Sequence, residues 1–236
     1  MKSLLLLLTF IGTFNIAFGQ KTIYTKKESI SLNHYCYVYG RDLNTPCYSD
    51  IISPIGWSKD GLFAYFHHIP TKSESTFLVI LDVKTGEKIL DALFYGESEQ
   101  VAIEDKKAVE ALKKHKIINQ VEEATYDFGY LVAVNNELGK RNPQTDWPRQ
   151  CESATAYIFD KKKKEHTPYR QSILVHKDKE NEYSGELHYE RVMKSPFGEY
   201  YTLFFYHISC GWEGDDHEFM LKVAGFDPSK NKELKP

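Results

Sequence analysis

The chain has 236 residues, with 33 acidic and 30 basic side chains and a formal net charge of −3. This mildly acidic balance argues against a nucleic-acid partner, because phosphate binding needs a clustered basic face. Aromatic residues make up 14% of the chain. They gather with β-branched residues in short runs, which is typical of β structure.

The first 20 residues, MKSLLLLLTFIGTFNIAFGQ, have the three parts of a secretory signal peptide. Lys2 supplies the positive charge, residues 4–16 form a short apolar core, and Ala17 and Gly19 are the small residues that a signal peptidase accepts. The alternative is a buried N-terminal helix. We therefore predict a signal peptide over residues 1–19, cleavage near Gly19, and a secreted or periplasmic protein.

We expect residues 20–236 to form one mainly β domain, since no linker rich in Pro, Gly or Ser divides them. No segment after the leader holds the ~20 apolar residues that a membrane span needs. Alternating apolar residues bounded by turn residues predict strands at 29–39, 62–69, 76–83, 88–94, 125–134, 153–159, 171–175, 184–193, 200–208 and 218–223.

One segment, residues 98–117, has a helical composition instead. It is rich in Ala, Glu, Lys and Leu, its apolar residues recur at helical spacing, and lysines gather towards its end. Ser98 is the predicted N-cap. We expect this helix to cover an open sheet edge or the end of a barrel.

All four cysteines, Cys36, Cys47, Cys151 and Cys210, follow the predicted leader. An even count in an oxidising compartment predicts two disulfides, for which three pairings are possible. If Cys36 bonds Cys47 and closes a short turn-rich loop, Cys151 bonds Cys210 and ties two distant strands. A structural zinc site is the alternative, but the chain has no C-x-x-C motif.

Residues 57–61 spell W-S-K-D-G and precede the strand LFAYF, and residues 82–86 spell D-V-K-T-G. This pattern resembles the repeat of TolB-type β-propellers. A degraded second copy starts at residue 194 and continues from residue 217. The whole arrangement also resembles uncharacterised secreted bacterial proteins with one such segment, a similarity that implies no known activity.

The number of predicted strands decides the expected architecture. A propeller blade has four strands and a closed ring needs at least four blades, so about ten strands do not close a ring. We therefore predict a mainly β fold, either an antiparallel meander in two packed sheets or a partial propeller-like arrangement, with one helix near residues 98–117.

Histidines are the weak candidates for a metal site. His67 and His68 point to opposite faces of one strand, so they cannot easily share an ion. His67 could meet His207 if the two repeat units are neighbours, and His217 lies beside two aspartates. No rigid ligand spacing supports a metal, so no metal and no cofactor are predicted.

The most unusual loop is CGWEGDDHE, residues 210–218. An aromatic platform beside carboxylates can bind a sugar or a cation, which makes Trp212, Asp215 and Asp216 candidate ligand-binding residues. Trp147 lies in a second long polar loop, residues 135–153. A Cys151–Cys210 disulfide would place both tryptophans on one rim. The alternative is an ordinary acidic loop.

No catalytic motif for acyl transfer, zinc hydrolysis or phosphate binding occurs. We therefore predict a non-catalytic binding or envelope-associated module whose partner is an unidentified ligand or envelope protein. The alternative is a secreted or periplasmic hydrolase that acts on glycan or peptide with acids or histidines in the same loops. An accessory subunit is a third possibility.

Overall fold

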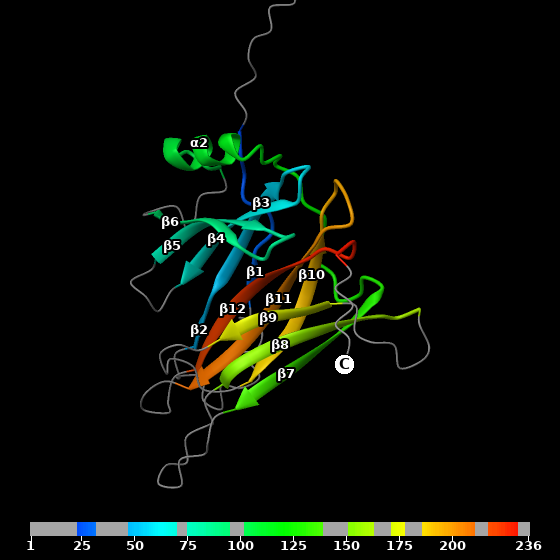
Figure 1. Ribbon diagram of the computed structural model, residues 1–236. Coiled ribbons are helices and arrows are strands. Elements are labelled where there is room, and N and C mark those ends of the chain that lie inside the picture. The colour runs from blue at the N-terminus through cyan, green and yellow to red at the C-terminus, as the bar shows by residue number, and fades with distance from the viewer. Residues whose placement is uncertain are drawn as a thin grey trace, which may run out of the picture.

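The computed structural model describes residues 23–31, 47–69, 75–94, 102–138, 151–162, 171–177, 186–210 and 217–230. These residues are mainly β, as predicted, and form three sheets and one helix (Figure 1). The upper sheet has the order β1 (Ile30–Ser31), β3 (Ile51–Trp57), β4 (Leu62–Ile69), β5 (Ser75–Asp82) and β6 (Lys88–Phe94). The middle sheet has the order β10 (Leu187–Lys194), β11 (Tyr201–Cys210), β12 (His217–Phe226) and β2 (Cys47–Ser49). The lower sheet comprises β7 (Tyr130–Leu138), β8 (Cys151–Asp160) and β9 (Gln171–Lys177).

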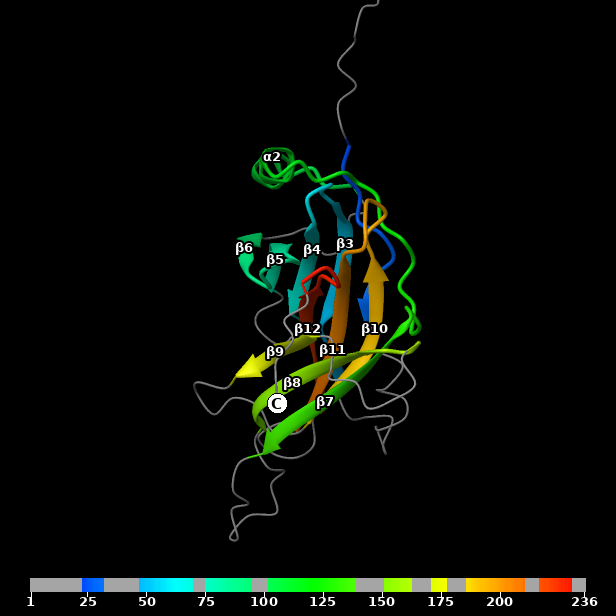
Figure 2. The same ribbon diagram turned by 45° about the vertical axis from the view of Figure 1, so that its right-hand side comes forward.

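The helix and the three sheets stack as successive layers, with α2 (Lys106–Lys114) at the top in Figure 1 and Figure 2. One buried cluster, which includes Ile55 and Leu112, packs the helix on the upper sheet. A second cluster, which includes Phe63 and Phe204, joins the upper and middle sheets. A third joins the middle and lower sheets and includes Ile158. The strands are antiparallel except for the β12–β2 pair.

The two predicted repeat copies correspond to two comparable hairpins, β4–β5 and β11–β12, and the strand before each hairpin, β3 or β10, pairs with its first strand. The turn that leads into each hairpin begins with a buried serine. The Ser58 Oγ accepts hydrogen bonds from the backbone N–H groups of Asp60 and Leu62, and the Ser195 Oγ accepts one from Phe197. The two hairpins share this turn chemistry and pack face to face across the buried cluster between the upper and middle sheets.

Strand β3 was missed by the sequence patterns because proline and glycine interrupt it. Its pairing with β4 shifts register between Pro54 and Gly56, which marks a bulge. Gly56 lies against the chain after the helix, where the Trp57 N–H donates to the Ile118 carbonyl at 3.0 Å and Ile118 donates back at 2.8 Å. A proline is tolerated at such an irregular position of a strand.

The helix is confirmed, but it starts later than residue 98. Its N-cap is Asp105, whose Oδ1 accepts a hydrogen bond from the Ala108 N–H at 2.9 Å, and Ser98 lies outside the described residues. The chain just before the cap is extended because Ile103 donates to the Tyr24 carbonyl at 2.9 Å. No helix in the described part of the chain has the length and apolarity to cross a membrane.

A bulge in β10 interrupts the alternation of side chains along this strand. Tyr189 pairs with Phe205 and Arg191 with Phe204, so Glu190 is the extra residue. Glu190 is buried, and its Oε1 accepts a hydrogen bond from the Arg191 guanidinium at 2.7 Å. The inserted residue reverses the faces of β10 from this point onward, so Arg191 does not share the face of Tyr189.

The turn between β10 and β11 gives the fold a small pH dependence. The Glu199 carboxylate accepts a hydrogen bond from Lys194 Nζ at 2.7 Å and another from the Tyr201 hydroxyl. The Lys194 bond, then the Tyr201 bond, lower the pKa of Glu199 below its ordinary value of 4.5.

A folded-state pKa below the unfolded value stabilises the fold at higher pH, and that contribution disappears as pH falls through the folded value. We therefore expect Glu199→Gln to lower the free energy of unfolding at pH 7 by at most about 0.5 kcal/mol, because the carboxylate is mostly exposed. Urea unfolding at pH 7 and pH 3 checks this, and equal differences at both values would contradict it.

Candidate functional site

The predicted rim of tryptophans and aspartates cannot be placed. Trp147, Trp212, Asp215 and Asp216 lie outside the described residues, and of His217 only the backbone is described. The rim therefore stays a prediction.

The register of the strands limits which cysteines can form a disulfide. Cys210 pairs with His217, which pairs on its other side with Cys47. Two strand spacings separate Cys47 from Cys210, roughly 9.6 Å, which exceeds the ~7 Å limit between the Cα atoms of a disulfide. Of the three pairings, this argues against the one that joins Cys47 to Cys210. The side chains of Cys47, Cys151 and Cys210 are not described, and Cys36 lies outside the described residues.

The structure separates the candidate histidines. His67 Nε2 lies 2.8 Å from Asp50 Oδ2, between the upper and middle sheets. His68 lies on the other face, where its Nδ1 is 3.0 Å from the Thr76 hydroxyl. His207 shares the face of β11 that packs on the lower sheet, so the middle sheet separates it from His67. Within the described residues, no three His, Cys, Asp or Glu side chains are grouped to hold a metal ion.

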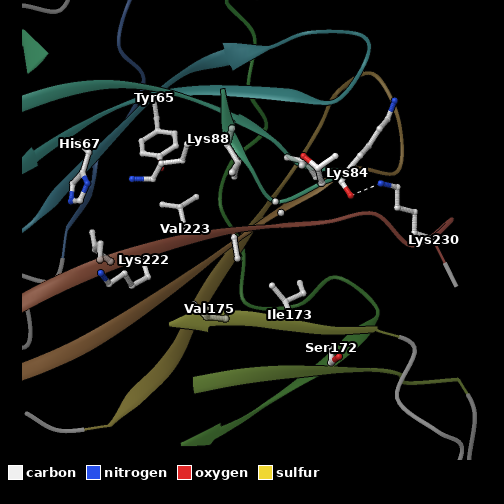
Figure 3. Close-up of a pocket in the computed structure, with 17 residues that line it drawn as sticks. Tyr65, His67, Lys84, Lys88, Ser172, Ile173, Val175, Lys222, Val223 and Lys230 are labelled. Carbon is white, nitrogen blue, oxygen red and sulfur yellow. Dashed lines mark hydrogen bonds between the residues drawn. The ribbon is translucent and has the colours of Figure 1, made fainter. Parts of the chain in front are cut away.

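The described structure has a cleft of about 780 Å³ where the sheets diverge. Strands β5 and β6 extend beyond the middle sheet, so part of the inner face of the upper sheet has no sheet opposite it (Figure 2). Figure 3 shows Tyr65 and Lys88 on this wall, Val223 of β12 facing them, and Ile173 and Val175 of β9 beyond β12. The cleft is therefore a product of tertiary packing.

The cleft is basic although the whole chain is acidic. The described residues that line it include four lysines and one histidine, and none of them is acidic. Lys88 Nζ lies 2.8 Å from Asp91 Oδ2, and Lys230 Nζ donates to the Lys84 carbonyl at 2.5 Å. Lys84 Nζ lies over the Tyr200 ring, 5.0 Å from its centroid. Lys88, Lys84 and Lys230 thus have partners within the protein, and Lys222 of β12 is the fourth lysine that lines the cleft.

Asp50 is buried behind the cleft wall, where it contacts two residues that line the cleft. Its Oδ2 accepts a hydrogen bond from the Leu221 N–H at 3.1 Å and is also the partner of His67. Asp50 follows β2, so this carboxylate links the junction of β2 and β3 to β4 and to β12. The contact orients the imidazole at the cleft wall, an arrangement that suits hydrogen bonding to a ligand.

Tyr65 supplies a neutral phenol to the same wall. Burial, and secondarily the negative charge of Asp91, raise the pKa of Tyr65 far above its ordinary value of 10. The hydroxyl therefore stays protonated at every physiological pH. It can form hydrogen bonds but adds no negative charge to the cleft.

Sequence reasoning identified His67 but missed the cleft. The lysines of the cleft that we assign to ligand binding come from the start of β6, from β12 and from the chain after β12, and they are separated by up to 142 residues, from Lys88 to Lys230. The sequence shows them only as isolated lysines among 30 basic residues. The cleft was not missed because its strands were missed, since β5, β6 and β12 were all predicted.

Comparisons with known proteins add no assignment to this geometry. Searches of family models, of curated protein sequences and of solved structures find no match to the chain.

Proposed function

We propose that this protein is an exported, non-catalytic binding module and that its basic cleft takes an amphipathic anion. The observation that carries the proposal is the composition of the cleft. Apolar side chains and lysines line it together, and no acidic side chain is among its described lining residues. The natural ligand then combines an apolar body with a carboxylate, sulfate or phosphate group.

Size and apolar character support a small ligand or a short segment of a larger one. Typical ligand sites enclose roughly 300–1,000 Å³ and place a few polar groups on mainly apolar walls. The cleft, at about 780 Å³, falls in this range. Tyr65, Leu81 and Val223 would contact the apolar body, while Lys88, Lys222 and the ammonium group of Lys230 would meet the anion.

The N-terminal sequence supports export, since residues 1–19 have the pattern of a signal peptide. Two disulfides would suit that compartment. Of the two pairings that strand register leaves open, we favour Cys36–Cys47 with Cys151–Cys210, because the first closes a short loop. The loops of Trp147 and Trp212 would then form a second contact surface at one end of the molecule.

The test measures binding of anilinonaphthalene sulfonate, a fluorescent amphipathic anion, by the purified protein. We expect saturable binding that octanoate displaces and that the uncharged octanol displaces poorly. The triple variant Lys88→Gln, Lys222→Gln, Lys230→Gln should bind the probe about tenfold more weakly or worse, since each partly exposed ion pair contributes up to about 1 kcal/mol.

The matched control removes three lysines far from the cleft, in the variant Lys106→Gln, Lys107→Gln, Lys113→Gln. These side chains lie on the exposed face of α2, so their loss changes the net charge equally without touching the cleft. Equal weakening in both triple variants would show that only net charge matters and would overturn the proposal. Hydrolysis of an ester or peptide probe, lost on His67→Asn, would favour the hydrolase instead.

A further inference from the structure

Strand β12 presents part of one edge to the cleft. Leu221 pairs with Tyr206 of β11, yet its N–H donates to Asp50 and not to β11. In an antiparallel pair, the N–H and C=O of one residue point to the same side, and the side alternates along the strand. The backbone polar groups of Val223 therefore also point away from β11, towards the cleft that this residue lines.

This edge has defined ends. On one side, β2 covers β12 only as far as the Ser49–Phe219 pair, and the Asp50 side chain covers the N–H of Leu221. On the other side, Gly225 approaches the backbone of Val83 so closely that a Cβ on Gly225 would lie 2.5 Å from it. In the described part of the chain, no strand pairs with β12 between these limits on the side away from β11. The open stretch spans about four residue steps, roughly 13 Å.

We propose that the ligand of the cleft is an extended acidic peptide that adds as a short strand to the edge of β12 at Val223. This inference rests on the proposed function and names the ligand class of that site. The peptide backbone would pair with the N–H and C=O of Val223, and three or four of its residues would lie between Asp50 and Val83. Strand addition of this kind obtains affinity from main-chain hydrogen bonds and specificity from alternate side chains.

The walls on either side of the open edge fit such a strand. A peptide beside β12 would turn alternate side chains towards Tyr65 and Leu81 of the upper sheet and towards Ile173 and Val175 of β9. The surrounding lysines favour acidic side chains at the ends of the segment and disfavour basic ones. An open strand edge in a soluble protein is otherwise a liability, which natural proteins cover or protect.

The test uses a capped pentapeptide with glutamate at each end and three valines between, and it measures the peptide's dissociation constant for wild-type protein and for Val223→Pro. Proline lacks the N–H that the peptide would use, and a strand tolerates it where that N–H is unpaired. We expect the peptide to bind Val223→Pro about tenfold more weakly than wild type, or worse. Val223→Thr keeps the N–H and should bind the peptide as the wild type does.

Two further measurements keep the outcome decisive even if Val223→Pro folds poorly. In wild-type protein, the peptide should slow hydrogen exchange of the Val223 amide, and the same peptide with methylated backbone nitrogens should not bind. An unprotected Val223 amide, or equal affinity of the methylated peptide, would overturn strand addition while leaving anion binding intact. Loss of sulfonate binding in the wild type would instead remove the proposed function itself.

Discussion

Replacing Gly56 by alanine is expected to lower the free energy of unfolding by about 3 kcal/mol, one of the largest single effects in this protein. A Cβ on Gly56 would lie 2.0 Å from the Ile118 carbonyl oxygen, a backbone atom that cannot turn aside. Relief of that clash must separate β3 from the chain after the helix, which also removes the two hydrogen bonds between Trp57 and Ile118. Thermal and urea unfolding of the purified variant measure the loss.

The control for this substitution is Gly86→Ala. Gly86 has a positive φ of 77°, but a Cβ there would meet nothing within 4 Å. Its cost is therefore only conformational, about 1–2 kcal/mol. If Gly56→Ala destabilised the fold no more than Gly86→Ala, the close approach of β3 to Ile118 would be wrong.

Replacing Trp57 by alanine is expected to cost about 3–5 kcal/mol, the range for large aromatic side chains in a core. Trp57 is fully buried, and its ring lies 4.7 Å from that of Phe63, centroid to centroid. Its indole N–H has no hydrogen-bond partner among the described residues. Trp57→Phe should therefore cost much less, since it keeps an aromatic ring and removes an unsatisfied donor.

Denaturant unfolding of both variants, alongside Leu131→Ala, decides this prediction. Leu131 is 55% exposed, so its truncation should change stability by less than about 0.5 kcal/mol. Equal losses for Trp57→Phe and Trp57→Ala would mean that the indole nitrogen is bonded and that the ring contributes little. The tryptophan of the W-S-K-D-G segment packs in the core, and its contribution to stability needs no ligand to explain it.

Much of the fold follows from local patterns in the sequence. Residues 62–69 and 88–94 were predicted with the bounds of β4 and β6, because alternation there agrees with burial on one face of a sheet. The patterns failed where tertiary contacts override local preference. Pro54 and Gly56 are typical of a turn, yet they lie in β3, because this strand pairs with β1 on one side and with β4 on the other.

The candidate site was less predictable than the fold. A cleft between diverging sheets depends on how far β5 and β6 extend beyond β12, and this has no counterpart in local periodicity. The bulge at Glu190 likewise needs the partner strand to reveal it. The sequence directed attention to rare residues, the tryptophans and cysteines of long loops, whereas the cleft uses common lysines brought together by packing.

The parallel pair of β2 and β12 has a consequence for the order in which the molecule is built. Phe219 and Ser49 are neighbours in one sheet, and Leu221 donates to Asp50 across 171 residues of chain. The middle sheet cannot close until β12 has been synthesised, so β2 lacks its partner strand until nearly the whole chain has been made. Contacts of such long sequence separation slow folding.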